Sequence, residues 1–215
     1  IGVIPALVNT NLKHKSLEHS VTVINAKAFI FDSEYFSVVK EAMPLINQKV
    51  KLDYFSFGCI DKQLLAESPV EVKPLKKMID KASAESVNYK GNFSDRLFYL
   101  YTSGTTGLPK AAIIRNSRYF VASKGSNMGM KLKKDDVLYT PLPLYHSAAA
   151  MLGVSQSLLF GVSVALRPKF SASKFWEDCI HYKCTAAQYI GELCRYLLNQ
   201  KETPIERQHN VRVMY

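Results

Sequence analysis

YLYTSGTTGLPK, at residues 99–110, is the stretch that decides the fold of this chain. It directly follows an apolar, strand-like run and combines hydroxyl side chains, glycines and a lysine, namely Thr102, Ser103, Thr105, Thr106, Gly104, Gly107 and Lys110. Glycines let the backbone approach an anion closely, and the amides of such a nest donate to phosphate oxygens. The segment therefore predicts a polyphosphate-binding loop.

The spacing differs from that of the GxxxxGK[ST] phosphate loop. Gly104 and Lys110 are separated by TTGLP, and Ala111 stands where a serine or threonine would be needed. This argues against a Walker-type NTPase. An ordinary turn rich in serine, threonine and glycine between two strands is the alternative.

The segment resembles the signature [YF]TSG[ST]TGxPK of the AMP-forming adenylate ligases, the superfamily of acyl-CoA synthetases, luciferases and peptide-synthetase adenylation domains. The resemblance implies that Lys110 and Thr105 act in catalysis. It also implies that the whole stretch binds the nucleotide, that is Tyr99, Leu100, Tyr101, Thr102, Ser103, Gly104, Thr105, Thr106, Gly107, Leu108, Pro109 and Lys110.

A second stretch, PLPLYH at residues 141–146, resembles the PL[FY]H motif that these ligases carry about thirty residues after the signature. The resemblance implies that Tyr145 and His146 line the acyl side of the site. The alternative is a histidine that closes a strand and is hydrogen-bonded locally.

A third stretch, YIGELCRYLLNQ at residues 189–200, is similar to the fatty acid transport proteins, also called very-long-chain acyl-CoA synthetases. IGVIPALVNTNL and PKFSASKFWEDCI resemble the same family, so the similarity covers the chain. Gly191 predicts a tight strand-to-helix turn and is a further acyl-pocket candidate, and Leu193, Leu197 and Leu198 are expected on one helix face.

The resemblance implies ATP-dependent activation of long- or very-long-chain fatty acids to acyl-CoA through an acyl adenylate, coupled to fatty acid uptake. ATP, Mg²⁺ and CoA are the implied cofactors and substrates. Two alternatives stay open: a fatty acid carrier in which ligation is secondary, and a ligase for another carboxylic acid.

Strands alternate with helices along the chain, which predicts an α/β fold with mostly parallel sheets flanked by helices. Residues 61–92 are polar and predict an exposed connection with one short helix and no strong strand. Strands are expected near residues 6–8, 26–32, 49–58, 96–102, 110–114, 137–142, 161–167, 186–190 and 211–215, and helices near 17–24, 35–46, 75–82, 117–125, 147–160, 171–182 and 192–199.

The formal net charge of +10 over 215 residues favours anionic partners, such as nucleotide and CoA phosphates or an acidic membrane surface. Scattered lysines and the absence of an RNP-type motif argue against nucleic acid. Four cysteines predict reduced thiols of an intracellular protein, and Cys179 and Cys184 are expected as buried helix thiols rather than zinc ligands. The relatives suggest endoplasmic reticulum, plasma membrane or peroxisome.

Residues 137–166 contain no charged side chain, which raises the question of a membrane span. Pro141, Pro143, His146 and Gln156 make the run only mildly apolar, so a buried helix and strand is expected. Contact of this region with lipid stays open.

The resemblance also requires parts that this sequence lacks: a YGxTE-like segment, a ribose-binding aspartate, a hinge and a small C-terminal domain. We therefore expect residues 1–215 to be an incomplete AMP-binding domain, without the C-terminal domain and an N-terminal segment. We expect this piece alone to be catalytically inactive.

Overall fold

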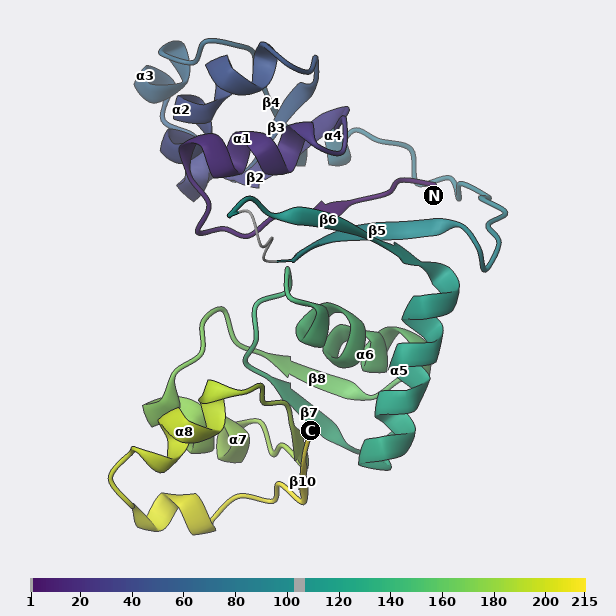
Figure 1. Ribbon diagram of the computed structural model, residues 1–215, viewed down its shortest axis with the longest axis vertical. Coiled ribbons are helices and arrows are strands. Elements are labelled where there is room, and N and C mark those ends of the chain that lie inside the picture. Colours follow the sequence, from purple (N-terminus) through teal and green to yellow (C-terminus); the bar gives the residue numbers. More distant parts are fainter. Residues whose placement is uncertain (1, 103–106) are drawn as a thin grey trace. The chain divides into compact units, whose positions relative to one another are not determined.

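The computed structural model describes residues 2–102 and 107–215 (Figure 1). The chain forms two compact units, one of Ile1–Lys90 with Tyr99–Ala112 and the other of Gly91–Phe98 with Ile113–Tyr215. Strands β5 (Arg96–Thr102) and β6 (Lys110–Arg115) are divided between the units, and both match the expected strands.

The first unit is built on a parallel sheet with the strand order β2-β3-β4. Its elements are β1 (Ala6–Leu7), α1 (His14–Thr22), β2 (Ala28–Asp32), η1 (Ser33–Tyr35), α2 (Phe36–Asn47), β3 (Asp53–Phe57), α3 (Lys62–Ala66), β4 (Val72–Pro74) and α4 (Leu75–Ile79). Leu17 and Val21 of α1 pack with Val39 and Met43 of α2 in one buried cluster, which explains their helical spacing.

Residues 61–92 of this unit differ from the expectation. Residues 61–92 contain α3 and the third sheet strand β4, so the expectation of a connection without a strand was wrong. Only Val72 of β4 is buried, which leaves no apolar run to mark the strand. Helix α2 contains Pro44 and continues to Asn47.

A second sheet of three strands has the order β1-β5-β6. Strand β1 pairs with β5 in parallel, with Ala6 opposite Tyr99 and Leu7 opposite Leu100. The N-terminal segment is thus held against the strand that leads into the signature segment, as residues 99–110 are called from here on.

The second unit is built on a sheet of four strands in the order β10-β9-β7-β8, in which every pair is parallel. Its further elements are α5 (Asn116–Met130), β7 (Val137–Thr140), η2 (Ala148–Val154), α6 (Ser155–Phe160), β8 (Ser163–Leu166), η3 (Ala172–Lys174), α7 (Phe175–His181), β9 (Ala186–Ala187), α8 (Glu192–Leu198), η4 (Pro204–Arg207) and β10 (Val213–Met214). Parallel sheets and flanking helices confirm the expected α/β class.

The end of α7 explains why two cysteines lie together. The Cys184 N–H donates to Cys179 O at 2.7 Å, and Lys183 between them has a φ of 52°. This is a Schellman motif, in which the two outer side chains meet in an apolar contact. Both thiols are fully buried, as expected. A hydrogen bond with Cys184, together with burial, raises the pKa of the Cys179 thiol.

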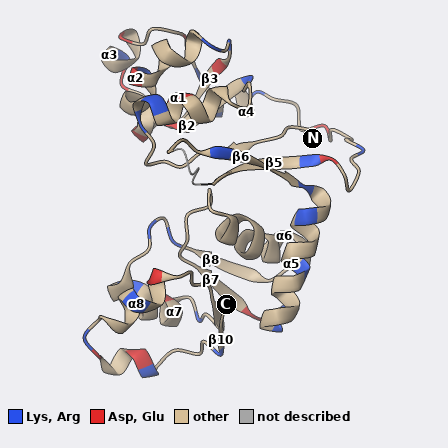
Figure 2. Ribbon diagram, viewed as in Figure 1, with Lys and Arg blue, Asp and Glu red and all other residues tan. Residues whose placement is uncertain are grey.

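The charge-free stretch at residues 137–166 is divided among β7, η2, α6 and β8, which carry no acidic or basic side chain (Figure 2). Leu138, Ala149 and Val162 from this stretch are buried in the second unit. Its elements therefore form part of a protein core, as expected. Across residues 2–102 and 107–215, every helix is too short or too polar to cross a bilayer.

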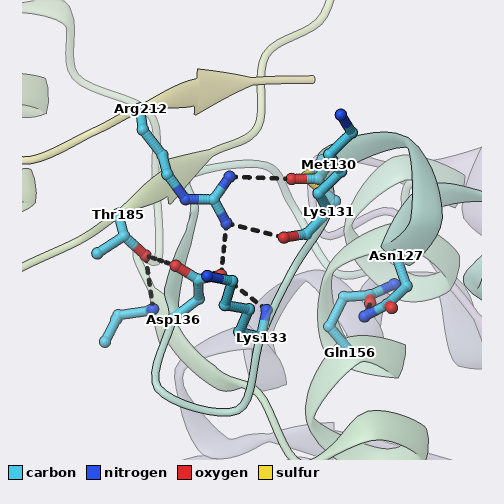
Figure 3. A network of polar contacts seen from close by, with 9 residues as sticks. Asn127, Met130, Lys131, Lys133, Asp136, Gln156, Thr185 and Arg212 are labelled. Atoms are coloured by element: carbon cyan, nitrogen blue, oxygen red, sulfur yellow. Dashed lines mark hydrogen bonds and ion pairs between the residues drawn. The ribbon is translucent and has the colours of Figure 1, made fainter.

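Asp136, just before β7, is a buried carboxylate surrounded by donors (Figure 3). It accepts from Thr185 Oγ1 at 2.6 Å and from the Lys133 N–H at 2.7 Å, and it pairs with Arg212 at 2.5 Å. Burial opposes ionisation, but the three donors outweigh it and lower the pKa of Asp136.

Arg212 connects this carboxylate to the end of α5 (Figure 3). Its guanidinium donates to Met130 O at 3.1 Å and to Lys131 O at 3.0 Å. These carbonyls lie at the helix C-terminus, where a cation is favourable. The Asp136–Arg212 pair therefore fixes α5 to the strand β10 that follows Arg212.

We predict that Asp136→Asn lowers the free energy of unfolding by about 2 kcal/mol at pH 7, since hydrogen bonds to a charged group are lost. Because the folded pKa is below the unfolded one, this stability is present above the ordinary aspartate pKa and is lost as pH falls through the folded pKa. Urea unfolding at pH 7 and at pH 3 measures the difference, which should shrink at pH 3.

Asp135→Asn is the matched control, because Asp135 is the neighbouring carboxylate and is exposed. It should change the unfolding free energy by less than about 0.5 kcal/mol. Equal effects of the two substitutions at pH 7 would contradict the assignment of the network.

Candidate functional site

The signature segment begins within β5, which ends at Thr102, and finishes at Lys110, the first residue of β6. Tyr99, Leu100, Tyr101 and Thr102 belong to β5. The predicted residues Ser103, Gly104, Thr105 and Thr106 lie outside the described residues. The described flanks of the segment are therefore residues 99–102 and 107–110.

The two flanks meet directly. Thr102 Oγ1 donates to Lys110 O at 3.5 Å, and both residues are exposed. Gly107 has a φ of 85°, a backbone conformation that favours glycine. The requirement comes from the backbone alone, because a Cβ at this position would meet open space. Lys110 has no acidic partner among the described residues, which leaves its ammonium available to an anion.

Helix α1 contacts both flanks. The Tyr101 hydroxyl donates to Ser20 O, and His19 Nε2 lies 3.0 Å from Pro109 O. A carbonyl only accepts, so His19 carries a proton on Nε2. His19 and Ser20 were not predicted from the sequence. Their partners lie 90 and 81 positions further along the chain, and no local pattern connects residues so far apart.

Tyr101 is held as a neutral donor. Burial, with a smaller contribution from Tyr99, raises the pKa of the Tyr101 hydroxyl to about 12. The phenol therefore keeps its proton throughout the physiological range and can serve the Ser20 carbonyl continuously.

The second predicted stretch forms a turn after β7, called here the histidine turn (residues 141–146). The His146 N–H donates to Pro143 O at 2.9 Å, and His146 Nδ1 accepts from the Ala148 N–H at 3.4 Å. His146 is exposed and Tyr145 is half-buried. With Nδ1 accepting, the neutral imidazole presents its N–H at Nε2.

The third predicted stretch comes close to the histidine turn. Leu193 of α8 packs against Leu142 of the turn and against Ala148 and Ala149 of η2. Gly191 precedes α8 with a φ of 43°, so the expected glycine turn between strand and helix is confirmed. Packing therefore brings two of the three resemblance segments together.

The expected apolar face of α8 is only partly correct. Leu193 and Leu197 are half-buried, whereas Leu198 is 84% exposed. Leu198 follows Leu197 directly and so points about 100° away from it around the helix. The prediction that all three leucines share one helix face was therefore wrong for Leu198.

The helix after the histidine turn was expected to be one α-helix over residues 147–160, but it begins as a π-helix, η2, and only then continues as α6. Two backbone carbonyls of η2 accept hydrogen bonds from side chains outside this helix. Gln188 Nε2 donates to Ala148 O at 3.1 Å, and Ser123 Oγ donates to Met151 O at 2.9 Å. Such remote donors compensate for the weaker geometry of π turns, and periodicity cannot reveal them.

Two polar atoms beside η2 are buried without a hydrogen-bond partner among the described residues: Thr140 Oγ1 and Gln188 Oε1. Both face Gly153 of η2. A Cβ at Gly153 would lie 2.7 Å from Gln188 Oε1 and 2.8 Å from Thr140 Oγ1. Gly153 therefore allows η2 to approach the carboxyl ends of β7 and β9, which is where ligands bind in open α/β sheets.

Comparison with protein families gives one match over the whole chain, residues 1–215, to the model described as AMP-binding enzyme. Long-chain fatty acid transport protein 1 of Homo sapiens is 44% identical over 212 residues, which cover 99% of this chain and 32% of that protein. The medium/long-chain-fatty-acid–CoA ligase FadD6 of Mycobacterium tuberculosis is 38% identical over 99% of this chain and 34% of its own length. The chain thus spans about a third of these relatives.

Among solved structures, the anthranilate CoA ligase AuaEII in complex with anthranoyl-AMP matches with a TM-score of 0.83. The match covers 99% of this chain and 40% of the ligase, at 18% sequence identity. At this identity the likeness concerns the fold.

The close packing at Gly153 yields a test of the geometry around η2. We predict that Gly153→Ala lowers the free energy of unfolding by about 1–3 kcal/mol, because the new methyl group overlaps two buried side chains. Chemical denaturation of this chain measures the change.

Gly125→Ala in α5 is the matched control, since a Cβ there meets nothing within 4 Å. Alanine favours a helix over glycine by about 0.5–1 kcal/mol, so this variant should be as stable as the parent or more stable. A stable Gly153→Ala variant would show that η2 is less tightly packed than described.

Proposed function

Because the chain belongs to the AMP-binding enzyme family, we propose that it supplies the ATP-phosphate side and part of the acyl side of a fatty acid–CoA ligase. The observation that carries the proposal is the signature segment. Its described flanks present Thr102, the Gly107 turn and Lys110 together at the junction of β5 and β6, and Lys110 has no acidic partner within residues 2–102 and 107–215. Similarity over 99% of the chain to proteins named for long-chain fatty acids supports the substrate class.

The reaction proceeds in two steps. A carboxylate oxygen of the fatty acid attacks the α-phosphorus of ATP, and the bond to pyrophosphate breaks to give an acyl adenylate. The CoA thiol then attacks the acyl carbonyl, loses its proton and releases AMP. Charge builds up on the phosphoryl oxygens in the first step, so positioned donors provide most of the help.

We assign the phosphates of ATP to the signature segment. Thr102, Ser103, Thr105, Thr106 and Lys110, with the amides of Gly104 and Gly107, hold the β- and γ-phosphates, and Lys110 and Thr105 are the proposed catalytic residues among them. Mg²⁺ enters with the ATP phosphates, in keeping with its preference for phosphate and water ligands. The net charge of +10 favours ATP, CoA and a fatty acid carboxylate alike.

We assign the acyl group to the histidine turn and the start of α8. Tyr145, His146 and Gly191 come from segments that pack together through Leu142 and Leu193. This contact supports a shared role, and a panel of acids differing in chain length would measure it.

The same experiments distinguish this function from two others, a fatty acid carrier and a ligase for another carboxylic acid. A fatty acid carrier in which ligation is secondary would retain uptake when the signature segment is altered, whereas trapping by ligation would lose it. A ligase for another carboxylic acid would prefer aryl or amino acids to oleate in the same panel. The structure of AuaEII with anthranoyl-AMP makes an aryl acid the first competitor to include.

We further propose that the protein works at an intracellular membrane surface, of the endoplasmic reticulum, plasma membrane or peroxisome. The support is the similarity to fatty acid transport proteins and the basic charge. Since the chain spans about a third of those relatives, we expect residues 1–215 alone to form no acyl-CoA.

We predict that Lys110→Ala in the full-length enzyme reduces ATP–pyrophosphate exchange with oleate by about 100-fold, the usual effect of losing one transition-state donor. Thr105→Ala should reduce exchange in the same direction. Formation of oleoyl- and lignoceroyl-CoA by the unaltered enzyme is measured in parallel and sets the preferred chain length.

Lys124→Ala is the control, because Lys124 is an exposed lysine on α5 outside the signature segment. It should leave exchange within about twofold. Full exchange activity in Lys110→Ala would exclude the proposed role of the segment, and an unaltered enzyme that forms no acyl-CoA would exclude the substrate class.

A further inference from the structure

We propose that His19 and Tyr101 form a clamp by which α1 positions Lys110 for ATP, so that His19 is a positioning residue of the proposed ligase. The inference rests on the proposed function and adds His19, which lies outside the signature segment. Its basis is that a single helix bonds to both described flanks of the signature segment.

Helix α1 is firmly fixed in its own unit. Leu17 and Val21 are buried in the core that α1 shares with α2. Glu18, also buried, pairs with Lys49 at 2.9 Å and accepts from Thr22 Oγ1 at 3.0 Å. The hydrogen bond from Lys49 leads the effects that lower the pKa of Glu18, so the carboxylate stays ionised and paired.

Helix α1 contacts both described flanks of the signature segment. The Tyr101 hydroxyl donates to Ser20 O on one side, and His19 Nε2 donates to Pro109 O on the other. Neighbouring residues of α1 thus hold both flanks. The contact from Thr102 Oγ1 to Lys110 O closes the frame between them.

The carbonyl that accepts from His19 is directly next to Lys110. Pro109 O lies in the peptide unit that joins Pro109 to Lys110, so the bond from His19 orients the backbone from which Lys110 projects. An ammonium aimed at a phosphate is sensitive to such placement, because a misplacement of about 1 Å can cost 100-fold in rate. The His19 side chain is half-buried and Lys110 is exposed, and both residues belong to the first unit.

The experiment compares substitutions in the full-length enzyme by ATP affinity, by KM for ATP and oleate, and by melting temperature. His19→Leu and Tyr101→Phe each remove one hydrogen bond and should raise KM for ATP by about 3–10-fold, while KM for oleate stays within about twofold. His19→Gln places an amide N–H at a similar reach and should restore KM for ATP to within about twofold.

Two controls separate positioning from general stability. His14→Leu removes the other histidine of α1, which is exposed beside Glu41 at 3.7 Å. Tyr54→Phe removes a phenol hydrogen bond to Asn47 Oδ1 (2.8 Å) in the same unit. Either control can lower the melting temperature, but neither should change KM for ATP.

An unchanged KM for ATP in His19→Leu overturns the clamp, as does a His19→Gln variant no better than His19→Leu. An equal rise of KM for ATP in the two controls also overturns it. Binding of a non-hydrolysable ATP analogue is measured by calorimetry apart from turnover. If the unaltered enzyme binds the analogue but forms no acyl-CoA, the substrate assignment fails while the clamp is still decided by the binding affinities.

Discussion

Backbone carbonyls at helix ends and around turns need donors, and both units depend on side chains that supply them from distant parts of the chain. His19 serves Pro109 O across 90 residues, and Arg212 serves Met130 O across 82. Gln188 and Ser123 serve carbonyls of η2 across 40 and 28 residues. An unpaired buried carbonyl costs about 1–3 kcal/mol, which applies in full to the buried contacts from Gln188 and Ser123 and in part to the half-buried contacts from His19 and Arg212. Irregular backbone is therefore specified here by remote polar side chains rather than by local propensity.

This dependence explains which parts of the fold could be predicted from the sequence. Strands β5 and β6 were predicted closely, because an apolar run and a glycine-rich turn are local signals. The π-helix η2 was predicted as an α-helix, since its alanines fit either and the donors from Gln188 and Ser123 are not local. Strand β4 was missed because its stability comes from pairing with β3, which no pattern within residues 61–92 expresses.

The candidate site divides in the same way. The signature segment was predicted from its residue types and from a family resemblance, the histidine turn from the resemblance, and the turn at Gly191 from the conformational freedom of glycine. Sequence reasoning did not find His19, whose contact with Pro109 exists only once α1 has packed on α2 through Leu17 and Val21. The face of α8 was overstated at Leu198, because helical spacing gives the direction of a side chain and not the presence of a neighbour.

The two proposed substrate regions are supported by different means, and this bears on how each can evolve. The flanks of the signature segment are tied to α1 by two hydrogen bonds, one of which ends on the carbonyl of the residue before Lys110. The histidine turn has local hydrogen bonds of its own, and its contact with α8 consists of apolar packing of Leu142, Ala148 and Ala149 against Leu193, in which changes of shape that conserve volume cost little. A ligase needs one invariant placement for triphosphate and an adjustable one for acids of different length. Directional bonds at the proposed nucleotide region and non-directional packing at the proposed acyl region would meet these two requirements separately.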